Sequence, residues 1–166
     1  IIVTLDVDGT YPFEIVEVLV AQIDAGADVA TASPYHPDGR VEGVSAVRLL
    51  FSRGASICYR VLVDRRVYTW TAMVRAYRAG VLRASIPEES GYLNIARTLV
   101  EARRRGARIV EAPAVLSTRT VGQSKAKVWR ITRSHLRYMR GLLWLRLSGR
   151  FWIAPRAATV AVAPHG

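Results

Sequence analysis

Two carboxylates directly behind an apolar segment are the first chemical feature of the sequence. Asp6 and Asp8 stand in LDVDGT, which follows the apolar start of the chain. At the C-terminal end of a parallel strand, two such carboxylates can hold a divalent cation that neutralises phosphate oxygens as charge develops. The motif therefore predicts phosphate chemistry at Asp6 and Asp8.

The charge distribution is a second feature, because acidic and basic residues separate along the chain. Residues 1–47 hold one basic and eight acidic residues, a balance of −7, whereas residues 48–166 hold 23 basic and five acidic residues, a balance of +18. No acidic residue follows Glu111. This polarity indicates a metal-binding acidic end and a basic end that faces phosphates, anionic lipid or nucleic acid.

Length and composition limit the fold. With 166 residues and 51% hydrophobic content, the chain can bury one sizeable core. Its first residues already have the pattern of a core strand with no preceding partner, so we expect that an N-terminal part is missing. Cys58 lies in an apolar stretch and is expected to be a small buried hydrophobe. No apolar run reaches the roughly 18 residues that a membrane-spanning helix needs.

Apolar periodicity predicts an α/β fold with a parallel sheet. Strands are expected at residues 1–5, 27–33 and 107–116, the last interrupted by Pro113. Helices are expected at residues 12–22, 44–63, 79–85, 91–106 and 126–147. Residues 68–78 are expected to be extended, 117–125 to form a loop, and 151–166 to form a weakly structured tail.

Two known families contain a strand that runs into Asp-x-Asp-Gly-Thr or a similar motif. The motif resembles the nucleophile loop of the haloacid-dehalogenase phosphatases and also the metal-binding Asp-x-Asp of glycosyltransferases. A phosphatase of that family needs a later lysine followed by an acidic pair. Here no aspartate follows Asp64, and the two lysines, Lys125 and Lys127, come after every acidic residue. The order of residues therefore argues against the phosphatase.

From Leu5 to about Lys127, the sequence resembles the family 2 glycosyltransferases, in the branch of the dolichyl- or polyprenyl-phosphate mannose synthases. Five blocks follow the order of that family: LDVDGTYP, ADVATASPYHPDG, RLLFSRGAS, TAMVRAYRAGVL and VEAPAVLSTRTVGQSK. The resemblance implies a partial Rossmann-like nucleotide-diphospho-sugar transferase sheet of the GT-A type. Residues 1–125 are then the C-terminal half of a catalytic domain, 126–150 a basic amphipathic helix at the membrane surface, and 151–166 a tail.

The same resemblance implies a metal-dependent, inverting hexosyltransferase. It would move mannose or glucose from a nucleotide sugar, of the GDP-mannose or UDP-glucose type, to a polyprenyl or dolichyl phosphate. Asp8 is expected as the direct ligand of Mg²⁺ or Mn²⁺ and Asp6 as its partner; the alternative is an aspartate that merely caps the following helix. Thr10 replaces the glutamine that the family often has, and its hydroxyl or a water can replace an amide oxygen.

The resemblance also assigns residues to the acceptor phosphate. Arg48 and Ser52 match two acceptor-phosphate residues and share one helix face at i, i+4 spacing. Arg119 and Lys125 match a mobile basic loop over the site. The alternative for all these cations is solvated surface charge.

Three departures from the family pattern leave other functions open. Pro34 replaces an arginine, Thr69 replaces an aspartate, and Arg97 replaces an acid. The chain could therefore be an inactive or divergent relative with another acceptor. A non-enzymatic basic module that binds lipid or nucleic acid is the second class, but aromatic residues do not interleave with the basic ones as nucleic-acid binding requires. We expect no nucleic-acid partner.

The helix expected at 126–147 has a basic stripe. It consists of Arg130, Arg133, Arg137 and Arg140, and the opposite arc holds Ile131, Tyr138, Met139, Leu142, Leu143 and Leu145. Anionic lipid attracts such bases, and the helix contains no acid. We expect a cytoplasmic protein, peripheral on the inner face of the membrane; the alternative is a helix that packs its apolar arc against the domain.

Overall fold

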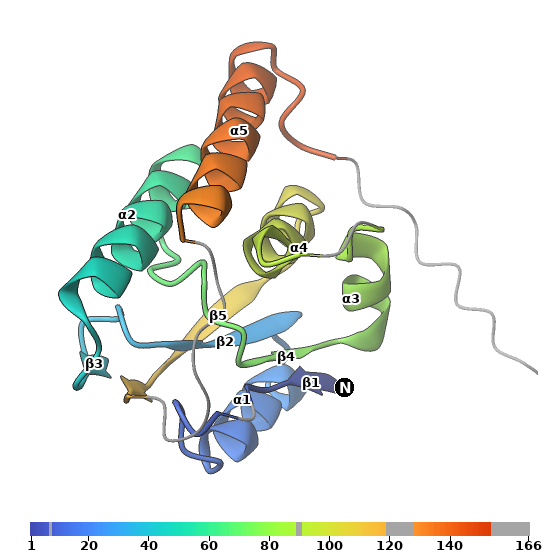
Figure 1. Cartoon of the computed structure of the whole chain (residues 1–166). Coiled ribbons are helices and arrows are strands. Elements are labelled where there is room, and N and C mark those ends of the chain that lie inside the picture. The colour runs from blue at the N-terminus through green and yellow to red at the C-terminus, as the bar shows by residue number, and fades with distance from the viewer. Residues whose placement is uncertain (7, 89–90, 119–127, 154–166) are drawn as a thin grey trace, which may run out of the picture.

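The sheet is mixed rather than purely parallel. The computed structural model describes residues 1–6, 8–88, 91–118 and 128–153. The strands, in sheet order, are β1 (Ile2–Thr4), β4 (Arg75–Tyr77), β2 (Val29–Ser33) and β5 (Ile109–Pro113) (Figure 1). β2 and β5 are parallel, as predicted, whereas β4 lies between β1 and β2 and is antiparallel to both. β1 and β2 therefore run in the same direction without pairing directly.

One face of the sheet is covered by α1 (Ile15–Asp24). Ile15, Leu19 and Ile23 are buried at i, i+4 and i+8, and they belong to a core cluster that includes alanines of β2 and β4. These small residues let the helix approach the sheet closely. Gly26, with φ of +99°, adopts the left-handed conformation that ends the helix at the predicted position.

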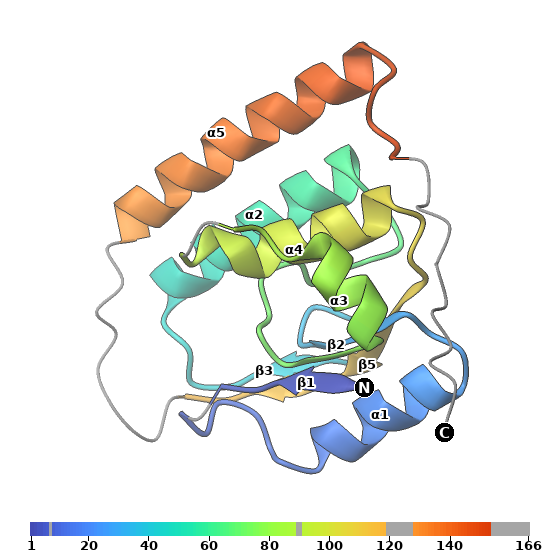
Figure 2. The same ribbon diagram turned by 90° about the vertical axis from the view of Figure 1, so that its right-hand side faces the viewer.

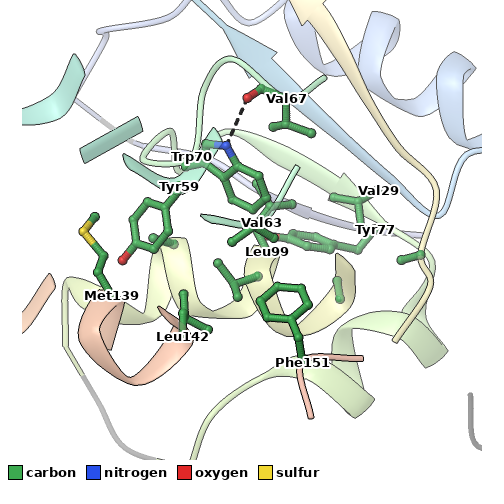
Figure 3. Packing of buried hydrophobic residues seen from close by; sticks show 14 residues of the cluster. Val29, Tyr59, Val63, Val67, Trp70, Tyr77, Leu99, Met139, Leu142 and Phe151 are labelled. Atoms are coloured by element: carbon green, nitrogen blue, oxygen red, sulfur yellow. Dashed lines mark hydrogen bonds between the residues drawn. The ribbon is translucent and has the colours of Figure 1, made fainter. Parts of the chain in front are cut away.

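The opposite face is covered by α2 (Ala46–Leu62), the short α3 (Ala79–Ser85) and α4 (Leu93–Arg104) (Figure 2). Their core surrounds Trp70, whose indole lies among Tyr59, Val63 and Leu99 (Figure 3). The Trp70 Nε1–H donates to the Val67 carbonyl oxygen at 3.0 Å, so this buried polar group is satisfied.

The last helix, α5 (Val128–Leu147), lies over α2 and α4 on the side away from the sheet (Figure 2). Met139 and Leu142 are buried there, and Tyr138 and Leu145 pack against the same core. Most of the apolar arc opposite the basic stripe therefore faces the domain, which is the packing alternative, while Leu143 is exposed. The four arginines of the stripe are exposed.

Two short strands form a separate two-stranded sheet near the predicted site. β3 (Arg40–Val41) and β6 (Val115–Leu116) form a parallel pair. The strand predicted at 107–116 thus ends its pairing with β2 at Pro113 and resumes with β3. The interruption lies where the sequence predicted it.

Two sequence expectations are wrong. Cys58, on α2, is exposed rather than buried. β1 is half-buried rather than a buried core strand, since it is at the edge of the described sheet. Within the part of the chain that the structure describes, no helix combines the length and the apolar character needed to cross a membrane.

Candidate functional site

A small polar pocket lies where β1 and β2 end, and it contains three of the predicted site residues. Asp6 enters it from the loop after β1, and Arg48 and Ser52 enter it from α2. The cavity measures about 60 Å³, while a bound water needs roughly 10–15 Å³. The pocket therefore has room for a phosphate-sized group and not for a whole nucleotide sugar.

The aspartate loop is held by its own backbone. The Thr10 amide donates to Asp8 Oδ1 at 3.2 Å, and Gly9 takes a φ of +72° in the turn between them. The N-cap of α1 is Glu14, so Asp8 closes a turn and does not cap that helix. The helix-cap alternative is therefore wrong for Asp8. Asp6 lines the pocket, whereas Asp8 is not among its lining residues.

The side-chain hydroxyl of Thr10 is a buried polar group beside these carboxylates that has no partner among the described residues. Thr10 is only 1% exposed, and its Oγ1 forms no hydrogen bond in that part of the chain. Thr10 also lines the pocket together with Asp6. A buried hydroxyl without a partner is costly, so a ligand that accepts or donates there would stabilise it.

The donor set fits a hard divalent cation. Mg²⁺ is typically bound by one or two carboxylates, with waters and substrate phosphates completing an octahedron. Asp6, Asp8 and the Thr10 hydroxyl supply oxygen donors of that kind. Across the described ranges, no group of three His, Cys, Asp or Glu side chains is placed to hold a metal ion.

Hydroxyl groups of Tyr35, Ser52, Thr69 and Thr71 form part of the pocket wall. The Tyr35 hydroxyl donates to Ser52 Oγ at 2.8 Å, and Ser52 Oγ lies 2.8 Å from Thr71 Oγ1. A second pair, Ser33 Oγ and Thr69 Oγ1, is 2.7 Å apart, and the Tyr35 amide also donates to Thr69 Oγ1. Ser52 was expected at the site from its sequence motif, whereas Tyr35 was not. The only signal for Tyr35 was that it stands in ADVATASPYHPDG, directly after Ser33 and Pro34.

Glu111 fixes the segment that carries this wall. Its Oε2 and Oε1 accept hydrogen bonds from the backbone amides of Tyr68 and Thr69, both at 2.8 Å. Glu111 is on β5, so the carboxylate ties the 68–71 segment to this strand of the sheet. In the sequence, Glu111 stands out as the last acidic residue, and it begins the Glu-Ala-Pro part of a quoted block. Neither feature predicted that it accepts hydrogen bonds from the 68–71 segment.

The departures from the family pattern do not all fall at the pocket. Pro34 and Thr69 both line it and lie next to one another, since the residue after Pro34 donates its amide to Thr69. Arg97 is on α4, with its guanidinium carbon 5.8 Å from the ring centroid of Tyr138, and it lines neither this pocket nor the neighbouring groove.

The pocket opens into an apolar groove between α2 and α5. The groove measures about 680 Å³ and shares Arg48, Ser52 and Thr71 with the pocket. Its apolar walls include Leu50, Phe51, Ile95, Ile131, Leu136 and Met139. A polar end and a long apolar body are therefore joined at Arg48 and Ser52.

Burial keeps the phenols of the pocket protonated. Desolvation raises the pKa of Tyr11 far above its ordinary value, and the neighbouring Tyr35 and Asp6 raise it further. Desolvation also raises the pKa of Tyr35, although Ser52 and two arginines oppose the shift. Both hydroxyls therefore remain hydrogen-bond donors at neutral pH. Arg119 and Lys125, the predicted basic loop, lie outside the described residues.

Three relatives found by comparison with known proteins are named as mannose synthases or mannosyltransferases that act on polyprenol, undecaprenyl phosphate or dolichol phosphate. No model of a known protein family matches the chain. It is 34% identical over 128 residues to the polyprenol monophosphomannose synthase of Mycolicibacterium smegmatis, covering 75% of this chain and 48% of that protein. It is 30% identical to the undecaprenyl-phosphate mannosyltransferase of Micrococcus luteus, over 75% of this chain and 52% of the relative.

A third relative is archaeal. The dolichol-phosphate mannosyltransferase of Pyrococcus furiosus is 27% identical over 76% of this chain and 36% of its own length. The chain thus spans about half the length, or less, of the curated relatives it matches.

Proposed function

Because the chain belongs to the polyprenyl-phosphate mannosyltransferase branch of the glycosyltransferases, we propose that it takes part in moving mannose from a nucleotide sugar to a polyprenyl phosphate. The observation that carries this proposal is the junction at Arg48 and Ser52. There a pocket that also holds Asp6 meets an apolar groove. A lipid phosphate has the matching shape, with an anionic head on an apolar chain.

The donor side of the proposal concerns Asp6 and Asp8, in a domain of the GT-A type. These carboxylates would hold Mg²⁺ or Mn²⁺ against the diphosphate of the donor, with the Thr10 hydroxyl as a direct or water-mediated neighbour. When bound, the cation supplies positive charge that stabilises the departing nucleoside diphosphate. The relatives' names favour mannose, so the proposed donor is GDP-mannose, with UDP-glucose as the alternative to be tested.

The acceptor side concerns the cations of the basic half. An ionised lipid phosphate is already a nucleophile, so the site needs positioning rather than a general base. Arg48 and Ser52 would hold the phosphate, with Arg119 and Lys125 closing over it. A phosphate oxygen then forms a bond to the anomeric carbon as the bond from that carbon to the diphosphate breaks, which inverts the configuration.

The outer surface of α5 supports a location at the membrane. Besides the exposed arginine stripe, it exposes four large apolar side chains that do not line the groove: Trp129, Leu143, Trp144 and Leu147. The described helix contains no acidic residue. Such a surface suits the interface of an anionic leaflet, where each base contributes about 1 kcal/mol of attraction. We place the protein on the cytoplasmic face, where it would meet a polyprenyl phosphate without extracting it.

A transfer assay tests the proposal. Full-length protein is incubated with Mg²⁺ or Mn²⁺, polyprenyl phosphate and either radiolabelled GDP-mannose or UDP-glucose, and the lipid product is extracted. We expect label in the lipid from GDP-mannose and not in reactions that lack the lipid phosphate. No labelled lipid from either donor would contradict the proposal, and labelling from UDP-glucose alone would replace mannose by glucose.

A further inference from the structure

Three hydroxyl groups at the junction of pocket and groove hold more protons than their mutual hydrogen bonds use. Tyr35, Ser52 and Thr71 each carry one donor proton. The Tyr35 hydroxyl donates to Ser52, and one further hydrogen bond joins Ser52 to Thr71. Three protons and two hydrogen bonds leave one proton over, whichever way the second bond runs.

The remaining proton is carried by Ser52 or by Thr71. If Ser52 donates to Thr71, the Thr71 proton is left over; if Thr71 donates to Ser52, the Ser52 proton is left over. Both residues line the pocket and the groove, and neither proton has another acceptor among the described contacts. The cluster is therefore a donor site for an oxygen that enters the junction.

We infer that Tyr35 and Thr71 are positioning residues that both donate to Ser52 Oγ and so direct the Ser52 proton to a phosphate oxygen of the acceptor. This inference rests on the proposed function, because it names the partner of a site proposed for a lipid phosphate. An ionised phosphate only accepts hydrogen bonds, so it selects the arrangement in which Ser52 donates outward. Two incoming hydrogen bonds also polarise the Ser52 hydroxyl and make it a stronger donor.

Tyr35 is anchored well enough to serve this purpose. Its amide donates to Thr69 Oγ1 at 3.3 Å, and the Arg53 guanidinium carbon lies 5.3 Å from the centre of its ring. Burial raises its pKa, so the phenol keeps its proton at neutral pH. Thr69 is in turn held by Glu111 through its own amide. These contacts hold the Tyr35 side chain in place, and its hydroxyl donates to Ser52 Oγ.

The test measures binding of geranyl phosphate, a ten-carbon prenyl monophosphate, by isothermal titration calorimetry without any donor sugar. The variants are Tyr35→Phe, Ser52→Ala and the double variant, with Tyr68→Phe as a matched control. Tyr68 is a neighbouring phenol that lines neither cavity. We expect Ser52→Ala to weaken binding about 10- to 100-fold, and Tyr35→Phe about 3- to 10-fold. The double variant should bind as weakly as Ser52→Ala alone, because Tyr35 acts through Ser52.

Thr71 provides a second route if Tyr35→Phe does not fold. Thr71→Val should weaken binding a few-fold, and Thr71→Ser should restore it because it keeps the hydroxyl. Geraniol, which lacks the phosphate, should bind the wild type and the variants equally. In the transfer assay, the variants should raise the KM for the lipid phosphate and leave the KM for the nucleotide sugar unchanged.

Different results separate the two proposals. If wild type binds geranyl phosphate and Tyr35→Phe or Thr71→Val bind it equally well, the positioning role is wrong and the proposed function stands. The positioning role is also wrong if the fold-losses in geranyl phosphate affinity of Tyr35→Phe and Ser52→Ala multiply in the double variant, because the two residues would then act independently. If wild type shows no binding of geranyl phosphate, the proposed acceptor site fails and the inference with it. Inorganic phosphate that binds as tightly as geranyl phosphate would contradict the lipid groove but not the hydroxyl arrangement.

Discussion

Thr69 Oγ1 and Ser33 Oγ lie 2.7 Å apart and join the end of β2 to the segment that lines the pocket. Both residues are almost completely buried. The family pattern that the sequence resembles implies an aspartate at the position of Thr69 and an arginine at that of Pro34, next to Ser33. Here Pro34 and Thr69 are both neutral, and the residue after Pro34, Tyr35, donates its amide to Thr69 Oγ1. Together, the two departures therefore leave no unpaired charge at this point of the pocket.

Replacing Thr69 by valine should destabilise the protein. The change removes a buried hydroxyl that pairs with Ser33 and accepts the Tyr35 amide, and it leaves both partners unsatisfied. We expect the free energy of unfolding to fall by about 1–3 kcal/mol, measured by urea denaturation. Thr69→Ser keeps the hydroxyl and should lose clearly less; equal losses in the two variants would mean that the hydrogen bonds do not contribute.

Asp8→Asn should weaken metal binding and leave the fold intact. The asparagine still has a carbonyl oxygen that can accept the Thr10 amide, but it removes one negative charge from the loop. Mutation of a residue that only hydrogen-bonds to a metal ligand typically lowers metal affinity about 10- to 100-fold. Asp8 is proposed as a ligand itself, so removing its negative charge should lower the Mn²⁺ affinity at least that much. Titration with Mn²⁺ followed by calorimetry measures the effect, and EDTA should abolish transfer by the wild type.

Asp38→Asn is the matched control for that experiment, since the Asp38 side chain is 80% exposed and lines neither cavity. It should bind Mn²⁺ like the wild type. Asp6→Asn is expected to be harmful but less so than Asp8→Asn. Unchanged Mn²⁺ affinity and transfer activity in Asp8→Asn would refute the assignment of this loop.

Arg48→Ala should impair use of the lipid phosphate. A hydrogen bond to a charged group is worth about 1.5–3 kcal/mol, so the KM for the lipid should rise roughly 10- to 100-fold. Arg119→Ala should act in the same direction, while hydrolysis of the nucleotide sugar is less affected. Arg83→Ala, which removes an exposed cation of α3 outside both cavities, is the control. If Arg48→Ala changes only donor binding, the roles of the two substrates at the junction are reversed.

The stability of the domain should fall in mild acid because of His135. This histidine on α5 is 7% exposed, its Nδ1 lies 2.8 Å from the Tyr59 hydroxyl, and burial lowers its pKa. The unfolded chain therefore binds the proton more readily than the folded one. The stability is complete above pH 6.5, the ordinary pKa of histidine, and decreases as the pH falls toward the lower pKa of the folded state. Urea midpoints between pH 7.5 and pH 5 measure the slope.

His135→Gln should flatten this pH dependence, because it removes the group that gains the proton on unfolding. His36→Gln is the control, since His36 lies in the loop after β2 and is partly exposed. It should keep the slope of the wild type. A slope that survives in His135→Gln would assign the pH dependence to other groups.

Local patterns predicted the elements that depend on nearby residues. The burial of Ile15, Leu19 and Ile23 follows from their helical spacing, and the end of α1 follows from Gly26. The pairing of β1 with β4 was not predictable in this way. It joins Ile2–Thr4 to Arg75–Tyr77, about seventy residues away. No local signal in the sequence shows that an antiparallel strand, β4, is inserted between β1 and β2.

The candidate site was predictable only in part for the same reason. Asp6, Arg48 and Ser52 stand in motifs with a recognisable order, and the structure brings them to one pocket. Tyr35 and Thr71 act through contacts that span 17 and 19 residues, and common hydroxyl residues carry no charge pattern that would single them out. For the basic helix, the sequence left packing and membrane binding open, and the structure shows that part of its apolar arc packs against the domain.

Membrane binding should depend on the arginines that α5 exposes. Met139 and Leu142 are used for packing, so attraction to lipid must come from the outward surface, where Arg133 and Arg137 lie among exposed apolar side chains. Arg133→Glu combined with Arg137→Glu changes the net charge by four. At about 1 kcal/mol for each base removed, binding to anionic vesicles should weaken at least roughly 30-fold. Flotation with phosphatidylglycerol-containing and with purely zwitterionic liposomes measures the effect.

The matched control changes the same net charge elsewhere, at Arg40→Glu combined with Arg83→Glu. These two exposed residues lie on β3 and α3, away from α5 (Figure 2). The control should still float with anionic liposomes, because a surface charge more than a Debye length from the lipid contributes little. Equal loss in both double variants would show that total charge, rather than the α5 surface, governs binding. Equal flotation of all three proteins with both liposome types would show that α5 does not dock on the membrane.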